Sequence, residues 1–389
     1  MSGTMRPRRL RNNTIFLVVA LVAVVAVLGG MVHATGALYA AATQPTPAVV
    51  PTLGNQASVA VRSEDMLSVR GPQIVNGLGR PVTLVGATDN SLEYACWGDG
   101  HFQFSDFLAM RSWGMNTVRI SLSSAFWRDL DGACPDYAST VTAAVANALS
   151  AGLYVILTLQ WNAPFSLPQD ATIGGTQCPL PDATYDVRFW QDIAEIYQDE
   201  PRVIFDLFSE PHDIDWSEWA NGGTISSTCA NTYPDPHTYQ AIGMPVLASV
   251  VRATAPSNII ILSGIGWGYD LSGIQSSGLD LMKNVLYGTH PFNHGTGIQQ
   301  PAGWGHAFGS AAAQIPVIAT EFGAYDCKTN YISKAIAYFE RLHISFVAWA
   351  WTPGSCSTPS LLANWFGVPS EPYGAYIQRQ MLLVSKGSA

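Results

Sequence analysis

The sequence predicts an α/β fold, a (β/α)8 TIM barrel with a short N-terminal β-hairpin. Eight short apolar runs alternate with segments of helical spacing, and polar or aromatic residues stand where the runs end. Near-continuous apolar strands between helices indicate a parallel sheet covered on both faces. Eight such units favour closure into a barrel. The candidate strands span residues 82–87, 117–122, 154–159, 203–208, 259–264, 284–289, 316–321 and 345–350.

The segments around these runs complete the predicted barrel. Residues 67–86 contain two β-rich stretches around a Gly-rich turn, which predicts a hairpin that could plug the bottom of the barrel. The segments YASTVTAAVANALSAG and HTYQAIGMPVLASVVRATAP have helical spacing and are followed by Gly or Pro.

The N-terminal residues predict export from the cytoplasm. Four arginines between residues 6 and 11 precede an uncharged apolar run over residues 14–32, as in a signal peptide or a membrane anchor. The run is long for a signal peptide, whereas alanines at 40–42 suit a peptidase, so residues 1–42 fit either interpretation. Residues 43–60 contain three prolines and no charge, which predicts a linker before a catalytic domain at 61–389.

Charge and composition narrow the class of partner. The formal net charge is -9, and all four basic residues of the first sixty lie before the apolar run, so the rest of the chain is more acidic still. An acidic body disfavours nucleic acid and anionic lipid. We expect an extracytoplasmic monomer, secreted or tethered through residues 14–32.

The cysteines predict disulfides. An even number of cysteines in an exported chain favours pairing, and the absence of a CxxC motif argues against a structural zinc site. Sequential pairing would join neighbouring loops, although fifteen connectivities are possible. The six are Cys96, Cys134, Cys178, Cys229, Cys327 and Cys356.

Two glutamates are the candidate catalytic residues. Glu210 in VIFDLFSEPHD and Glu321 in PVIATEFGAYD each end an apolar run, where TIM barrels form their active sites. A retaining glycosidase needs two carboxylates about 5–5.5 Å apart, one as acid/base and one as nucleophile. Salt bridges at the barrel rim are the other interpretation.

The motifs around these glutamates resemble those of glycoside hydrolase family five, the cellulase family, over roughly residues 65–380. Ser209-Glu210-Pro211 is similar to the family's Asn-Glu-Pro triplet and is followed by His212, as in many members. Glu321-Phe322-Gly323 and the stretch Asn116 to Ile120 resemble two further family motifs. The resemblance implies that Glu210 is the acid/base and Glu321 the nucleophile.

Further residues are expected to support this pair. The resemblance implies that His290 positions the acid/base and that Trp351 lies under the reacting sugar. Arg119 should hydrogen-bond Glu321 and lower its pKa, whereas the surroundings of Glu210 must raise the pKa of that carboxyl. An ordinary ion pair and a loop histidine are the alternative interpretations of Arg119 and His290.

Tryptophans are expected to form the sugar platform, because a pyranose packs its C–H face on an indole ring. Trp349 lies two residues before Trp351 and is expected on the same side, deeper in the cleft. For the other candidates, ordinary packing is an equal interpretation. These are Trp97, Trp161, Trp216, Trp267 and Trp304.

Three positions depart from the family's pattern. Ser209 replaces the Asn that contacts the sugar 2-hydroxyl, Gln160 stands where the family often has His, and Phe292 replaces a Tyr that contacts the nucleophile. The missing hydroxyl should raise the pKa of Glu321 unless another tyrosine supplies it. The candidates for that tyrosine are Tyr287, Tyr269 and Tyr325.

We therefore expect a retaining enzyme that cleaves β-1,4-linked polysaccharide or oligosaccharide, most simply an endo-β-glucanase. No cofactor is expected, and the stretch between His290 and His294 does not have the helical pattern of a metal site. A β-mannanase, an exo-acting β-glycosidase and a carbohydrate-binding pseudoenzyme remain alternatives. An esterase is disfavoured because no GxSxG motif occurs.

Overall fold

A computed structural model describes residues 62–129, 132–162, 164, 176–274, 282–293 and 299–387, all within the unit Val50–Ala389. The expected N-terminal segment, the linker and His294 lie outside the described residues, so those predictions stay open. Among the described residues, no helix combines the length and the apolar character needed to cross a membrane.

Eight parallel strands form a closed barrel, which confirms the predicted fold class. They follow one another around the barrel in chain order, and β12 pairs with β3 to close it. Each falls on one of the predicted runs. The strands are β3 (Val85–Asp89), β4 (Thr117–Ser123), β5 (Tyr154–Trp161), β6 (Val203–Asp206), β9 (Ile260–Ser263), β10 (Val285–Thr289), β11 (Val317–Ala319) and β12 (Ser345–Ala348).

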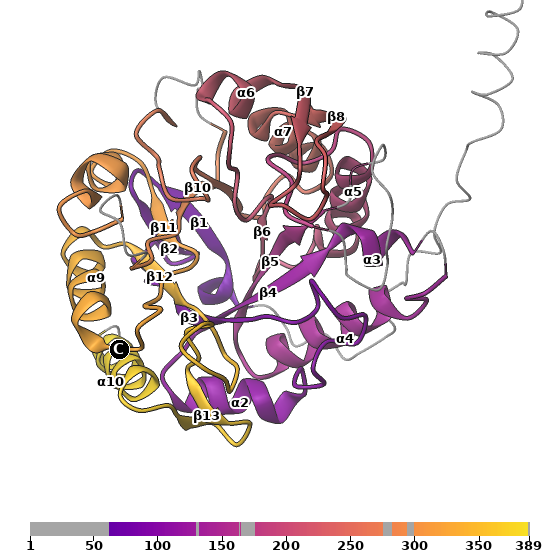
Figure 1. The fold of residues 1–389 in the computed structure, drawn as a ribbon. Helices are drawn as coiled ribbons and strands as arrows, with labels where there is room; N and C mark the ends of the chain where they lie inside the picture. The colour runs from indigo at the N-terminus through magenta and orange to yellow at the C-terminus, as the bar shows by residue number, and fades with distance from the viewer. Residues whose placement is uncertain are drawn as a thin grey trace, which may run out of the picture. The chain divides into compact units, whose positions relative to one another are not determined.

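Helices surround the barrel, as Figure 1 shows for α4, α5, α7 and α9. They cover the outer face of the strands, so both strand faces are buried, which explains the near-continuous apolar runs. The helical segments are η1 (Ser63–Asp65), α2 (Phe104–Ser112), α3 (Ser124–Arg128), α4 (Tyr137–Ser150), α5 (Tyr185–Tyr197), α6 (Trp216–Asn221), α7 (Met244–Thr254), η3 (Gly305–Gly309), α8 (Ser310–Ala312), α9 (Thr329–Leu342) and α10 (Tyr373–Gly387).

A hairpin plugs the lower end of the barrel, as predicted. Its strands β1 (Leu67–Arg70) and β2 (Gln73–Asn76) pair antiparallel. Leu67 and Ile74 join a cluster of inward-facing strand residues that includes Ile156, Ile204 and Ile318. The floor of the barrel is therefore apolar and leaves no room for chemistry.

One predicted helix begins later than expected. Residues 237–242 form strand β8 (His237–Ile242), which pairs antiparallel with β7 (Gly222–Ser227), and helix α7 starts only at Met244. Buried Tyr239 and Ala241 alternate with exposed neighbours, so this stretch follows the period of a strand. A further hairpin pairs β13 (Leu362–Asn364) with β14 (Val368–Pro369).

All six cysteines are paired sequentially, as expected. The disulfides are Cys96–Cys134, Cys178–Cys229 and Cys327–Cys356. They join loops that follow β3 and β4, β5 and β6, and β11 and β12. Each therefore links neighbouring loops at the end of the barrel opposite the plug.

The plug predicts a stability effect that is independent of activity. Ile74→Ala removes a buried side chain from the barrel floor, and we expect it to lower the free energy of unfolding by about 2–4 kcal/mol. Urea denaturation would measure the loss, with exposed Gln73→Ala as the control. Equal losses of unfolding free energy in the two variants would contradict the role of the hairpin as a plug of the barrel.

Candidate active site

The inward-facing positions change from apolar to polar along the strands. Along β5, alternate residues on the inner face are Ile156, Thr158 and Gln160. On the β11 side, Ile318 is followed at the same face by Thr320. The barrel thus has an apolar lower half and a polar upper end, where the disulfide-linked loops begin.

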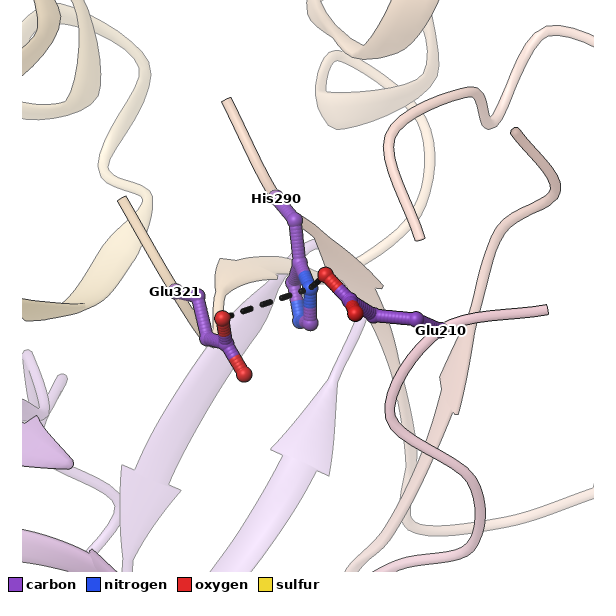
Figure 2. Close-up of side chains that lie close together, drawn as sticks. All are labelled: Glu210, His290 and Glu321. Atoms are coloured by element: carbon purple, nitrogen blue, oxygen red, sulfur yellow. Dashed lines mark hydrogen bonds and ion pairs between the residues drawn. The ribbon is translucent and has the colours of Figure 1, made fainter. Parts of the chain in front are cut away.

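Two carboxylates and one imidazole meet at this polar end. Glu210 follows β6, His290 follows β10, and Glu321 follows β11, the fourth, sixth and seventh barrel strands. Figure 2 shows the three side chains pointing toward one another. One carboxylate oxygen of each glutamate and one ring nitrogen of His290 all lie within 4.8 Å of one another. His290 Nδ1 lies 3.1 Å from Glu210 Oε1 and 3.9 Å from Glu321 Oε2. This carboxylate spacing suits a retaining glycosidase rather than an inverting one, which needs about 6.5–9.5 Å.

A buried arginine supports Glu321, as expected. Arg119 Nη1 donates to Glu321 Oε1 at 2.6 Å, and its Nε donates to Asp206 Oδ2 at 3.0 Å. Its Nη2 donates to Ser209 Oγ at 2.8 Å and to Thr158 Oγ1 at 3.1 Å. Asp206 was missed from the sequence, although a lone acid within an apolar strand was a usable signal.

Both oxygens of Glu210 accept hydrogen bonds. Besides His290 at Oε1, Gln177 Nε2 donates to Oε2 at 2.7 Å. His212 Nδ1 lies 2.8 Å from the Glu210 carbonyl oxygen, and its ring stacks on Trp267 with centroids 3.8 Å apart. Gln177 lies outside every predicted strand and motif, so the sequence held no signal for it.

The expected order of the two carboxyl pKa values is reversed in this site. Burial raises the pKa of Glu321, against the opposing charges of His290 and Arg119. For Glu210, burial acts upward, but the hydrogen bonds from His290 and Gln177 outweigh it and lower the pKa. The expectation was wrong because burial outweighs the opposing charges at Glu321, whereas the partners of Glu210 outweigh its burial.

An open cleft of about 1070 Å³ contains this group. Trp161, Trp267 and Trp349 line it, so these three tryptophans can stack on sugar rings. Other lining residues include Asn90, Glu93, Tyr94, Gln160, Gln177, Glu210, Asp213, Tyr269, Asp270, His290, Phe292, Gln299, Glu321 and Tyr325.

Trp351 does not lie under the cleft, contrary to expectation. It is 2% exposed and packs edge-on against Trp113, with ring centroids 4.8 Å apart. Strand β12 ends at Ala348, so the alternation that placed Trp349 and Trp351 on one side does not continue past the strand. The lining also lacks three other candidates, Trp97, Trp216 and Trp304.

The three departing positions have different surroundings. Gln160 and Phe292 line the cleft as expected. Ser209 is fully buried, does not line the cleft and donates to Glu321 Oε1 at 3.3 Å. Its hydroxyl also accepts a hydrogen bond from Arg119 Nη2, so Ser209 contacts both members of this ion pair.

Tyrosines could supply the hydroxyl that Phe292 lacks. Tyr269 and Tyr325 line the cleft, whereas Tyr287 packs into the apolar layer outside the barrel. Burial, together with the charges of Glu321 and Glu210, raises the pKa of Tyr325 to about 12. Tyr325 is therefore a neutral phenol close to both carboxylates.

The sequence missed Asn90 and Glu93, two polar residues that follow β3 and line the cleft near the predicted Gln160. Within the described part of the chain, Asn90 Oδ1 and Gln160 Oε1 are buried without a hydrogen-bond partner. Burial raises the pKa of Glu93 to about 8, so this third cleft carboxyl is protonated at neutral pH. Together these groups offer both donors and acceptors to sugar hydroxyls.

Glu210, His290 and Glu321 lie close enough together to bind a cation. However, Arg119 and Ser209 already hold one oxygen of Glu321, and both oxygens of Glu210 accept hydrogen bonds. Metal-independent chemistry therefore stays a prediction that suits these contacts.

A closed barrel with carboxylates after its fourth and seventh strands defines a class of glycosidase architecture. The model of the cellulase family, glycosyl hydrolase family 5, matches residues 76–355. The chain therefore belongs to glycosyl hydrolase family 5.

Relatives in sequence are endoglucanases. Endoglucanase N of Pectobacterium atrosepticum is 24% identical over 311 residues, which are 77% of this chain and 60% of the relative. Endoglucanase A of Evansella cellulosilytica is 22% identical over 323 residues, which are 78% of this chain and 57% of the relative. The chain thus spans little more than half the length of these relatives.

Solved structures share the fold. The β-glucanase SdGluc5_26A from Saccharophagus degradans has a TM-score of 0.63 and 23% identity, and the match covers 83% of this chain and 96% of that one. A hyperthermophilic endocellulase from Pyrococcus horikoshii has a TM-score of 0.62 and 18% identity, with 81% and 98% covered.

The ion pairs of Arg119 predict a large stability effect. Arg119→Met leaves Asp206 and Glu321 buried without their cation, and we expect a loss of about 3–5 kcal/mol in the free energy of unfolding. Arg188→Met is the control, because its partner Asp192 lies one turn away and the arginine is exposed; we expect a loss of about 0–1 kcal/mol there. Chemical denaturation would compare them, and similar losses would contradict the role given to Arg119.

Proposed function

We propose that this protein is a retaining endo-β-glucanase that hydrolyses β-1,4-linked glucan, with Glu321 as nucleophile and Glu210 as acid/base. The observation that carries the proposal is the close approach of these two carboxylates, within 4.8 Å, in an open cleft lined by tryptophans. Such a spacing allows one carboxylate to attack the anomeric carbon while the other serves the leaving oxygen.

In the first step Glu321 attacks the anomeric carbon and Glu210 protonates the leaving oxygen. Arg119 and Ser209 hold Glu321 Oε1, so Oε2 is the oxygen that attacks the anomeric carbon. A bond forms between Oε2 and that carbon as the glycosidic C–O bond breaks. The leaving oxygen takes the proton of Glu210, and a glycosyl ester on Glu321 remains.

In the second step water replaces the leaving group. Glu210, now a carboxylate, takes a proton from the water as its oxygen attacks the anomeric carbon. The ester bond to Glu321 breaks, and the carboxylate returns to its ion pair with Arg119. Two inversions give a product with the β configuration of the substrate.

Substrate binding must place the proton of the pair on Glu210. In the free protein the Glu210 side chain is 17% exposed and that of Glu321 is 4% exposed. A bound sugar would therefore remove water mainly from Glu210, and desolvation raises a carboxyl pKa. This effect opposes the two hydrogen bonds that lower the pKa of Glu210 in the empty cleft.

The substrate class rests on the cleft and on the relatives. Three lining tryptophans and an open cleft suit several consecutive sugar units. The β-glucanase of Saccharophagus degradans has been solved with cellotetraose, which supports a β-1,4-glucan here. A relative from Caldicellulosiruptor saccharolyticus is named β-mannanase/endoglucanase A, so mannan belongs among the substrates tested.

A second candidate is a carbohydrate-binding protein without turnover. The burial of Ser209 favours it, because no side chain at this position reaches the sugar where the family has Asn. Calorimetric binding of cello-oligosaccharides without release of reducing ends would support this candidate. Sugar release would exclude it.

We propose an extracytoplasmic location and a monomeric state. Three disulfides suit an oxidising compartment. The arginines and the apolar run at residues 14–32 suit a signal peptide or a tether.

Substitution of each glutamate should separate the two roles. Glu321→Gln should lower kcat at least about 10⁴-fold on every β-glucoside, because no nucleophile remains. Glu210→Gln should lose about 10²–10⁴-fold in kcat/KM on cellulose, and far less in kcat/KM on dinitrophenyl cellobioside, whose leaving group needs no proton in glycosylation. Steady-state kinetics would measure both. Full activity of Glu321→Gln would refute the assignment.

The stereochemistry gives an independent test. Proton NMR during early hydrolysis of cellopentaose should show the β anomer first, because both steps invert the anomeric carbon. Initial formation of the α anomer would exclude Glu321 as a covalent nucleophile.

A further inference from the structure

Gln177 makes the shortest hydrogen bond to the proposed acid/base. Its Nε2 lies 2.7 Å from Glu210 Oε2, whereas His290 Nδ1 lies 3.1 Å from the other oxygen. Oε2 and Oε1 thus have different donors, so the carboxyl plane is fixed from two sides. Gln177 also lines the cleft, as Glu210 does.

The backbone on both sides of Gln177 is tied down. Thr176 and Asn162 exchange backbone hydrogen bonds of 2.8 Å, and Thr176 Oγ1 donates to the carbonyl of Cys229 at 2.9 Å. Cys178 N donates to Asn162 Oδ1 at 3.1 Å, and Cys178 is disulfide-bonded to Cys229. Gln177 is therefore the middle residue of a segment anchored at each neighbour.

This anchoring links two barrel strands. Asn162 directly follows β5, and Cys229 lies in the loop system after β6, the strand that also leads to Glu210. Asn162 is itself held, since its Nδ2 donates to Asp186 Oδ2 at 3.1 Å. The position of Gln177 relative to Glu210 is thus set by contacts that do not involve a substrate.

We propose that Gln177 is a positioning residue for the acid/base, held against Glu210 by the Cys178–Cys229 disulfide. This inference rests on the proposed function. A carboxamide suits the task because it carries both a donor and an acceptor. Its N–H group binds Glu210 in the carboxylate form needed for deglycosylation. When the carboxamide flips, its oxygen accepts a hydrogen bond from the protonated carboxyl of Glu210, the form needed for glycosylation.

The consequence for the pH profile has a definite sign. Glu210 must be protonated for glycosylation, so its pKa sets the basic limb of kcat/KM. Gln177 stabilises the carboxylate and so lowers that pKa. Removing the donor should raise the pKa and move the basic limb to higher pH.

Other titratable groups, charged or neutral, surround Glu210 and stay unchanged when Gln177 is replaced. They come from its own segment, from β4, and from the loops after β3, β9, β10 and β11. A shift of the basic limb of kcat/KM when Gln177 is replaced therefore reports the loss of the Gln177 side chain. These groups are His212, Asp213, Arg119, Glu93, Asp270, His290, Glu321 and Tyr325.

The test uses Gln177→Leu in the full chain, with aryl β-cellobiosides as substrates. We expect the basic limb of kcat/KM to move up by about one pH unit, since one hydrogen bond to a carboxylate is lost. We expect kcat/KM to fall about tenfold or more for poor leaving groups and to change little for dinitrophenyl cellobioside, because kcat/KM reports glycosylation and this leaving group needs no proton. Gln198→Leu, which loses a solvent-exposed hydrogen bond to a backbone carbonyl on α5, is the matched control.

An unmoved limb with equal losses on all leaving groups would overturn the proposal. A second readout does not need turnover. In protein labelled with ¹³C at the glutamate carboxyls, the Glu210 signal, assigned with Glu210→Gln, should titrate at higher pH in Gln177→Leu than in the parent chain. If the Glu210 signal shifts in Gln177→Leu but the parent chain hydrolyses no glucan, the proposed function is refuted, whereas the contact between Gln177 and Glu210 is supported. No shift would refute the positioning role.

The disulfide is tested separately. Cys178→Ser with Cys229→Ser should move the basic limb in the same direction as Gln177→Leu. The matched control is Cys96→Ser with Cys134→Ser, which opens a loop of similar length, 38 residues against 51. Both pairs should lower the free energy of unfolding, but only the first should move the limb. A limb that moves equally in both, or in neither, would show that the disulfide does not hold Gln177.

Discussion

A positive charge lies at the centre of the barrel, and the site is arranged around it. The guanidinium of Arg119 is fully buried, so it is stable there only if carboxylates and hydroxyls take the place of water. Asp206, Glu321, Ser209 and Thr158 do so from three strands, β5, β6 and β11, or the residues that follow them. Because the planar group donates in fixed directions, it also fixes which oxygen of Glu321 faces the cleft.

The two carboxylates differ in how many of their oxygens accept hydrogen bonds. Glu321 is held through one oxygen by Arg119 and Ser209, which leaves the other oxygen available. Glu210 is held through both oxygens, by His290 and Gln177, in a more exposed position. A nucleophile needs one free oxygen, whereas a group that alternately gives and takes a proton needs partners that tolerate both forms.

The sequence was informative where a pattern repeats over several residues. Eight apolar runs predicted the barrel, and the ends of two runs predicted Glu210 and Glu321. It failed beyond the strand ends, where the two-residue alternation stops, as the burial of Trp351 shows. The pKa order and Gln177 depend on contacts between segments far apart in the chain, and no local pattern records such contacts.

The disulfides divide the rim of the cleft unequally. They link the loops after β3 and β4, β5 and β6, and β11 and β12, so every cysteine is used and the loops after β9 and β10 carry no covalent link. The wall beside Trp267 therefore depends on non-covalent contacts alone. A change in the length or sequence of the loops on that side would therefore leave all three disulfide pairings intact.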